Sequence, residues 1–191
     1  MDVKIKASVM DATKIRRIIY RMATEILERN RNLKNLAIVG IRTRGIFIGK
    51  RIARIIQEME NVEIPVGVMD ITRYRDDFAD QAAPPKSRKI DIQFSMAKRD
   101  IILVDDVLMT GRTIRAAMEG LFERGRPKSI QLLVLIDRGH RELPIRADYI
   151  GKQLPTSRRE IVQVRLKEID NRDEVQITEP IALKKKGKSR A

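Results

Sequence analysis

Short apolar runs alternate with amphipathic stretches along most of the chain, and this rhythm is the feature that most restricts its fold. The runs that predict strands cover residues 36–41, 64–71, 100–106 and 129–137. Strands buried on both faces are almost wholly apolar, and helices usually join parallel strands. The chain is therefore predicted to be an α/β protein with a parallel sheet flanked by helices.

The stretches between the runs have helical spacing. Residues 11–33 repeat apolar side chains every three or four positions and place arginines on the opposite face. Similar patterns cover residues 45–59 and 111–125, and the second ends at a glycine shortly before a proline. These three stretches are predicted to be the covering helices.

The pattern changes after Asp137. Short segments at 147–151, 161–166 and 174–178 are separated by turn residues, which predicts a small antiparallel flap attached to the main sheet, with a hood over about 138–160. Residues from about 72 to 98 show no period and are predicted to be a flexible loop or lid. We expect a single domain over 1–183 and a disordered basic tail over 184–191.

Composition narrows the classes of protein that fit. No cysteine is present, which excludes disulfides and thiolate metal sites, and no long apolar segment predicts a membrane span. We therefore expect a soluble, cytoplasmic protein with no membrane partner. The net charge is +14, and the five basic residues of the tail explain only part of it. Such a charge attracts polyanions, although a merely solvated basic surface is the alternative.

Two adjacent acids end the apolar run at 100–106. Asp105 and Asp106 supply only acceptor oxygens, which suits the two hydroxyl donors of a ribose 2′,3′-diol. The segment Thr110–Thr113 follows at a predicted helix start, where free N–H groups and hydroxyls favour a phosphate. A turn in which Asp106 only caps local backbone is the alternative. The combination of diol and phosphate partners favours a ribose-phosphate ligand.

A second anion site is predicted at "GIRTRG", where Arg42 and Arg44 surround a turn that leads into a helix. Arginine binds phosphate oxygens through two parallel hydrogen bonds, so pyrophosphate suits this turn. A solvated basic turn is the alternative. The Walker motif is excluded because no Lys-Ser/Thr pair follows the second glycine, and the dinucleotide GxGxxG pattern is missing.

The segment "ILVDDVLMTGRTIRAA" resembles the phosphoribosyl pyrophosphate (PRPP) signature of type I phosphoribosyltransferases. With "VGIRTRGI", "DITRYRDD" and "DRGHRELPIRADYIGK", the chain resembles, from about residue 10 to 180, the bifunctional pyrimidine operon regulators with uracil phosphoribosyltransferase activity. The resemblance implies a type I phosphoribosyltransferase fold. It also implies conversion of uracil and PRPP to UMP and pyrophosphate.

The resemblance assigns roles to individual residues. Asp105 and Asp106 would hold the ribose hydroxyls, and a loop containing Tyr74, Arg75, Asp76 and Asp77 would close over the reaction. The catalytic set is Asp105, Asp106, Arg75 and Arg44. The PRPP-binding set is Thr43, Arg44, Gly45, Asp105, Asp106, Val107, Leu108, Met109, Thr110, Gly111, Arg112 and Thr113. The uracil set is Asp137, Arg138, Tyr149 and Ile150, with Tyr149 over the base ring. Mg²⁺ would be held mainly through PRPP, with Asp105 and Asp106 as candidate ligands.

Two positions bear on specificity and proton transfer. Relatives that use hypoxanthine or guanine carry an aspartate at the position of Met109, so the methionine disfavours purine substrates. His140, the only histidine, is expected to satisfy nearby backbone rather than to act as a general base.

The same family binds the leader RNA of pyrimidine genes, with uridine nucleotides such as UMP and UTP favouring binding and PRPP opposing it. The RNA-binding candidates are Arg17, Arg21, Arg141, Arg146 and Lys152. The family also implies a homodimer or a higher homo-oligomer. Three hypotheses stay open: an enzyme that regulates through RNA, a regulator with residual catalysis, and a salvage enzyme whose basic surface binds polyanions non-specifically.

Overall fold

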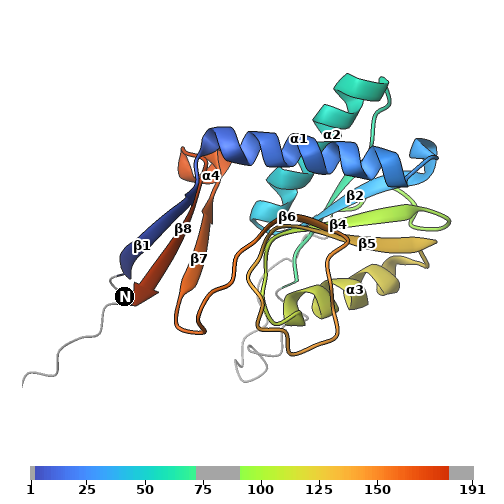
Figure 1. Ribbon diagram of the computed structural model, residues 1–191. Helices are drawn as coiled ribbons and strands as arrows, with labels where there is room; N and C mark the ends of the chain where they lie inside the picture. Colours follow the sequence, from blue (N-terminus) through green and yellow to red (C-terminus); the bar gives the residue numbers. More distant parts are fainter. Residues whose placement is uncertain (1–2, 72–90, 181–191) are drawn as a thin grey trace, which may run out of the picture.

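A five-stranded parallel sheet forms the centre of the protein (Figure 1). The computed structural model describes residues 3–71 and 91–180. The strand order is β3-β2-β4-β5-β6. The strands are β2 (Leu36–Ile41), β3 (Val66–Met69), β4 (Asp100–Leu108), β5 (Ser129–Asp137) and β6 (Tyr149–Gln153). The parallel sheet predicted from the apolar runs is confirmed.

Helices cover both faces of this sheet. Helices α1 (Ala12–Arg29) and α2 (Arg44–Glu60) lie on one face, and α3 (Arg112–Arg124) lies on the other (Figure 1). The apolar stripe of α1 is buried together with alternate residues of β2, β4 and β5, and the remaining residues of these strands pack against α3. A short 3₁₀ turn, η1 (Leu33–Asn35), leads from α1 to β2. The three predicted helices are confirmed.

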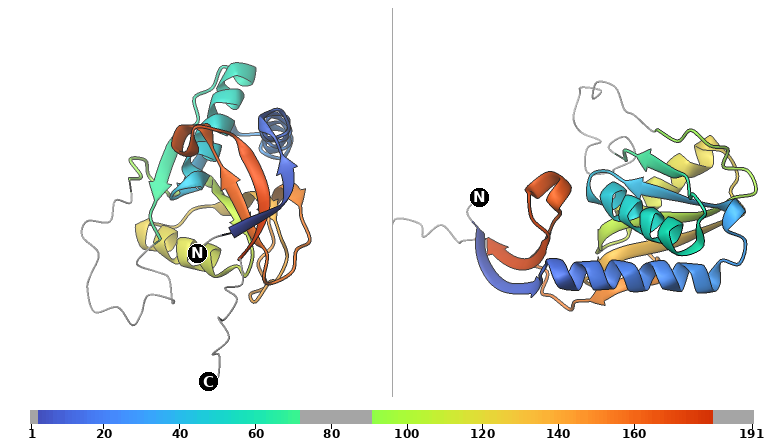
Figure 2. Two further views of the ribbon diagram at one scale, coloured as in Figure 1. Left: turned by 90° about the vertical axis from the view of Figure 1, so that its left-hand side faces the viewer. Right: turned by 90° about the horizontal axis from the view of Figure 1, so that it is seen from above.

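A second, antiparallel sheet lies beside the main sheet, and we call it the hood sheet (Figures 1 and 2). It consists of β1 (Val3–Met10), β8 (Glu174–Pro180) and β7 (Ile161–Arg165), in that order. The four-residue helix α4 (Lys167–Asp170) joins β7 to the turn before β8. The two ends of the described chain therefore meet in one sheet.

The composition of this sheet corrects the sequence analysis. Residues 147–151 were expected in an antiparallel flap, but β6 pairs in parallel with β5, and Leu133 is the partner of Tyr149. The prediction was wrong because β6 is short, so its period could not distinguish an edge strand of the main sheet from a hairpin strand. The strands of the antiparallel sheet therefore all lie outside residues 138–160. β1 was missed, although its residues alternate between apolar and polar.

The predicted long loop also ends earlier than expected. Asp91 forms a bridge with Val68 through two backbone hydrogen bonds of 2.9 Å, and Met96 is only 2% exposed. Residues 91–98 are thus packed on the sheet rather than looped away from it. Residues 72–90 and the tail from 181 lie outside the described part of the chain. Within the described ranges no helix is long and apolar enough to cross a membrane.

Candidate active site

Asp105 and Asp106 lie in the last part of β4, where the backbone fixes both carboxylates. The N–H of Asp106 donates to Oδ1 of Asp105 at 2.9 Å, and the N–H of Val107 donates to Oδ1 of Asp106 at 3.0 Å. Burial raises the pKa of Asp106 above its ordinary value, although the Asp105 hydrogen bond and the charge of Arg44 act in the opposite direction. A half-buried carboxylate of this kind gains from hydroxyl donors or a cation that stabilise its charge.

The turn after β4 presents the start of α3. Gly111, with a φ of 93°, directly precedes the helix, and the N–H of Arg112 donates to Oγ1 of Thr110 at 3.3 Å. The carbonyl of Thr110 accepts the N–H groups of Glu142 and Leu143 at 3.0 and 3.1 Å. The next loop therefore holds the turn in place. N–H groups at a helix start, with threonine hydroxyls beside them, suit a phosphate.

The turn between β2 and α2 lies directly against β4. The peptide bond between Arg42 and Thr43 is cis. A Cβ added to Gly45 would lie 2.2 Å from the carbonyl oxygen of Val104, so only glycine permits this approach. The approach places Arg44, the first residue of α2, close to the aspartates at the end of β4.

A cavity of about 380 Å³ joins Arg44 and Asp106 to the hood sheet. Its other lining residues are Val162, Gln163, Val164 and Arg165 of β7. Nη2 of Arg44 donates to both carboxylate oxygens of Asp170, at 3.0 and 3.2 Å. Its Nε is buried and has no hydrogen-bond partner within the described residues. The site therefore keeps a buried donor that an oxygen ligand would satisfy.

A second cavity, of about 600 Å³, lies at the ends of β5 and β6. Its lining includes Asp137, Arg138 and Ile150, three of the four residues assigned to the uracil pocket. Arg138 is 6% exposed, and its guanidinium donates to Oγ1 of Thr156 and to two carbonyls of the following loop. Burial lowers the pKa of Arg138. The cavity is therefore polar and cationic on this side.

Tyr149, the fourth predicted uracil residue, does not line this cavity. Its side chain is fully buried, and its hydroxyl donates to Oε1 of Gln131 at 2.5 Å and accepts from Nδ2 of Asn30 at 3.0 Å. Burial raises the pKa of this hydroxyl. The structure contradicts the prediction that Tyr149 lies over the base ring, because side chains alternate along β6 and Tyr149 faces α1 rather than this cavity.

His140 lines the second cavity and has a backbone φ of 64°. Its Nε2 lies 2.6 Å from the carbonyl oxygen of Thr156, which also lines this cavity. Because a carbonyl can only accept, the ring donates here. His140 therefore satisfies nearby backbone, the role that the sequence analysis expected.

The candidate RNA-binding residues differ in how exposed they are. The guanidinium of Arg141 contacts the carbonyls of Ile145 and Met109 and the carboxylate of Asp137, so it is used inside the fold. Nη2 of Arg21 donates to the carbonyls of Ile150 and Gly151 and thereby caps the outer edge of β6. The exposed members of the set are Arg17, Arg21, Arg146 and Lys152. The structure supports an RNA role least for Arg141.

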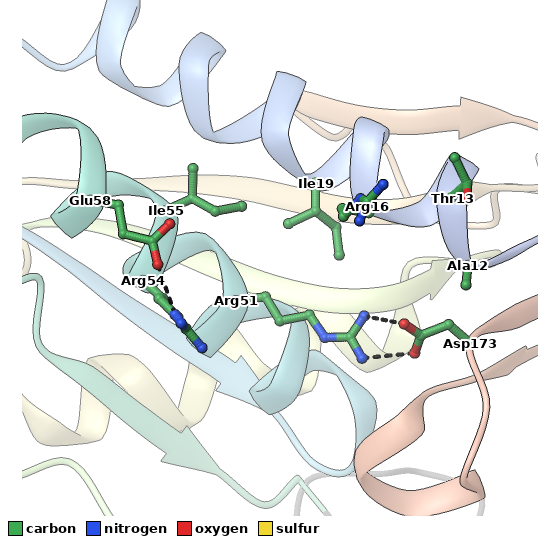
Figure 3. Close-up of a pocket in the computed structure, with 9 residues that line it drawn as sticks. All are labelled: Ala12, Thr13, Arg16, Ile19, Arg51, Arg54, Ile55, Glu58 and Asp173. Carbon is green, nitrogen blue, oxygen red and sulfur yellow. Dashed lines mark hydrogen bonds and ion pairs between the residues drawn. The ribbon is translucent and has the colours of Figure 1, made fainter.

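A third cavity, of about 480 Å³, lies between α1 and α2 (Figure 3). Neither Asp105 nor Asp106 lines it. Ile19 and Ile55 supply apolar wall, and the charge of Arg51 is offset by Asp173, which it contacts through two hydrogen bonds. This cavity is not part of the candidate active site. Its Arg51–Asp173 pair nevertheless fixes a turn that reaches the site.

Some contributors to the site were not found from the sequence. Asp170 and the β7 residues Gln163 and Arg165 come from segments without a motif, and only the fold brings them to Arg44. Tyr74, Arg75, Asp76 and Asp77 lie outside the described residues. No group of three potential ligands for a metal ion occurs among the described residues. Asp105 and Asp106 could supply two carboxylates to a cation whose other ligands are mostly oxygens of a substrate.

Comparison with known proteins agrees with this geometry. The family model described as "Phosphoribosyl transferase domain" matches residues 7–169. The chain is 53% identical over 175 residues to the bifunctional protein PyrR of Deinococcus radiodurans, covering 92% of this chain and 96% of that protein. It is likewise 53% identical over 176 residues to the bifunctional protein PyrR of Thermus aquaticus, covering 92% of this chain and 97% of that protein.

Solved structures show the same fold at low identity. A hypoxanthine phosphoribosyltransferase of Trypanosoma cruzi matches with a TM-score of 0.71 and 18% identity over 92% of this chain and 98% of its own. One from Staphylococcus aureus matches with a TM-score of 0.66 and 19% identity over 90% and 92%. At this identity the likeness shows the fold alone. The long matches at 53% identity show more: the chain belongs to the phosphoribosyl transferase domain family and, within it, to the bifunctional PyrR proteins.

Proposed function

We propose that the protein is a uracil phosphoribosyltransferase that also regulates pyrimidine gene expression by binding leader RNA. The observation that most supports the transferase activity is the continuous segment from Asp105 to Thr113. It offers two carboxylates and a helix start, and Arg44 lies beside Asp106. These groups match the ribose diol, the 5′-phosphate and the pyrophosphate of PRPP in turn.

In the proposed reaction, N1 of uracil forms a bond to the anomeric carbon of PRPP and loses its proton to the solvent, while the bond from that carbon to pyrophosphate breaks. Positive charge develops at the sugar carbon and negative charge on the leaving group. Asp105 and Asp106 would hold the hydroxyls beside that carbon, and Arg44 would offset the charge on pyrophosphate. Catalysis is therefore mainly positioning and electrostatic stabilisation.

Mg²⁺ fits this arrangement as a cofactor bound chiefly by PRPP. It would neutralise the charge that develops on the leaving group. Asp105 and Asp106 are the protein carboxylates placed to contact such a cation or its water ligands, since hard cations prefer oxygen. The residues Thr43 to Gly45 and Val107 to Thr113 complete the proposed PRPP site, and Arg75 stays a proposed catalytic residue.

The cavity at the ends of β5 and β6 is the proposed uracil site. Ile150 supplies an apolar wall, and Asp137 and Arg138 supply polar groups at its border. The backbone of β6 near Ile150 can read the edge of a base, as the resemblance implies. Tyr149 is not part of this proposal.

The proposed RNA surface combines α1 with the loop before β6 and with β6 itself. Arg17, Arg21, Arg146 and Lys152 contribute exposed cations there. Aromatic residues make up only 4% of the chain, so phosphate contacts and hydrogen bonds rather than extensive stacking would supply the affinity. A regulator of this kind responds to a ligand only through different affinities of its two states. We also propose a homodimer or a higher homo-oligomer that acts in the cytoplasm, with UMP and UTP as effectors.

A salvage enzyme whose basic surface binds polyanions non-specifically is the second candidate, and the charge of +14 favours it. Binding of a pyrimidine leader RNA across a salt series, beside a scrambled RNA of equal length, separates the two. We expect the leader to bind more tightly, with UMP enhancing and PRPP opposing the binding. Equal binding of both RNAs, with a steep salt dependence and no nucleotide effect, would support the salvage enzyme without a regulatory role.

A further inference from the structure

The turn formed by α4 and the residues after it brings three acids to helix α2. Asp170 contacts Arg44 at the first position of α2, while Glu168 and Asp173 contact Arg51 two turns later. We call these five residues the α4 latch. It joins the hood sheet to the helix that begins at the proposed PRPP site.

Asp170 is held rigidly. Both of its oxygens accept from Nη2 of Arg44, and Oδ2 also accepts the N–H of Leu166 at 2.9 Å. Burial raises the pKa of Asp170, but the bonds from Leu166 and Arg44 outweigh it and hold the pKa below its ordinary value. The carboxylate is therefore ionised at neutral pH and provides a fixed, charged acceptor.

The rest of the latch fixes the turn that carries Asp170. Nε and Nη2 of Arg51 donate to Glu168 at 2.8 and 2.6 Å, and Nη1 and Nη2 donate to Asp173 at 2.9 and 2.7 Å. Figure 3 shows the paired contact with Asp173. The N–H of Lys167 also donates to Asp173, at 2.8 Å. Two arginine forks thus anchor one short turn to one helix.

We infer that Asp170 is a positioning residue for PRPP binding, which holds the Arg44 guanidinium in the orientation that meets pyrophosphate. Nη2 is engaged by Asp170, while the buried Nε of Arg44 has no partner within the described residues. The fixed guanidinium therefore retains donors for a ligand. Without the carboxylate, Arg44 would gain rotamer freedom that binding must remove again. The inference rests on the proposed transferase function.

Steady-state kinetics and equilibrium PRPP binding of the full chain test the inference. Asp170→Asn should raise the KM and the Kd for PRPP about tenfold, with kcat and the KM for uracil changed less than about twofold. Asp173→Asn is the matched control, because it weakens the same turn at Arg51 without touching Arg44. It should lose thermal stability to a similar degree but weaken PRPP binding much less than Asp170→Asn does, because Glu168 still holds the turn to Arg51.

A double-mutant cycle gives the decisive readout. In an Arg44→Ala background, Asp170→Asn should have no further effect on PRPP binding, because the two residues act as a unit. Additive effects would overturn the inference, as would equal weakening in Asp173→Asn or tighter binding in Asp170→Asn, which would make Asp170 a competitor of pyrophosphate. If Asp170→Asn does not fold, Asp170→Glu serves instead and should show a smaller loss of the same kind. Absence of UMP formation by the unmodified protein would instead refute the proposed transferase function itself, and with it the role of Asp170 in PRPP binding.

Discussion

The segment from Asp105 to Thr113 and the hood sheet with its α4 latch are built in opposite ways. The first is a continuous stretch whose carboxylates, hydroxyls and helix start are fixed by their own neighbouring backbone. The second is assembled from both ends of the described chain, with β1 beside β8. It reaches the site through contacts between distant parts of the sequence, such as Arg44 with Asp170 and the β7 residues that line the first cavity. The proposed ligand-binding groups are thus encoded in one short stretch of sequence. The hood sheet, and the carboxylate that orients Arg44, depend on contacts between distant parts of the chain.

The largest effect is expected from Asp106→Asn, which alters the local segment alone. UMP formation should fall about 100- to 1000-fold, because a charged acceptor is lost beside the reacting carbon. The fold should not suffer. Burial raises the pKa of Asp106, so ionising it at neutral pH costs stability, and asparagine removes that cost while its Oδ1 can still accept from Val107.

Thermal unfolding and initial rates on the same preparation check this prediction. The Tm should stay equal or rise by about 2–4 °C. A lowered Tm in step with lost activity would mean that the carboxylate supports the fold rather than the reaction. Glu119→Gln, which neutralises an exposed carboxylate of α3 outside the proposed site, is the control for the loss of one negative charge.

The difference between the two regions also explains what the sequence could predict. The apolar run of β4, its two acids and the glycine before α3 are contiguous, so their spacing alone predicted strand, turn and helix. β1 was missed because its side chains from Lys4 to Ser8 are exposed and its partner lies at the other end of the chain. Tyr149 was misplaced because the face of a strand depends on its register, which a short segment does not reveal. Asp170 has no motif at all.

Gly45→Ala should be the next most damaging change, and it tests how tightly the local segment is held by packing. The added Cβ would lie 2.2 Å from the Val104 carbonyl oxygen, so α2 must move away from β4 and take Arg44 with it. We expect a loss of about 3 kcal/mol in the free energy of unfolding, measured by urea titration, and a raised KM for PRPP. Gly49→Ala is the control, because its closest neighbour is a side-chain methyl of Ile38 at 2.8 Å, which can give way. Equal losses in both variants would show that the approach at Gly45 has no special role.

The turn should also decide the choice of base. Met109 cannot exchange a proton, so hypoxanthine should be used at least about 100-fold less efficiently than uracil, the size of a missing acid–base group. Competing the two bases for PRPP in one reaction and separating the nucleotides measures the ratio of kcat/KM. Comparable formation of the purine nucleotide would show that base choice does not depend on Met109.

A smaller effect is expected from Glu168→Gln in the hood region. The hydrogen bond from Arg51 lowers the pKa of Glu168 below its ordinary value. A lowered carboxyl pKa adds stability that is present above the unfolded-state value and is lost as the pH falls through the folded value. The variant should thus be less stable at pH 7 by at most about 1 kcal/mol, since the pair is partly exposed. Urea midpoints of both proteins should converge as the pH falls below the folded-state pKa of Glu168. A constant gap between pH 7 and pH 3 would show that the charge of Glu168 is irrelevant.

The smallest effect is expected from His140→Asn, a change in the lining of the second cavity, outside both regions. Among the described residues, the ring hydrogen-bonds to the carbonyl of Thr156, and the backbone φ of 64° is one that asparagine tolerates better than most residues. Losing the hydrogen bond should cost about 1 kcal/mol of stability, and kcat and both KM values should stay within about twofold. A pH–rate profile is the sharpest measurement, because a general base at His140 would impose a limb that the variant would lose. Identical profiles would show that His140 only forms a structural hydrogen bond to Thr156. Loss of such a limb would show that it takes part in the reaction.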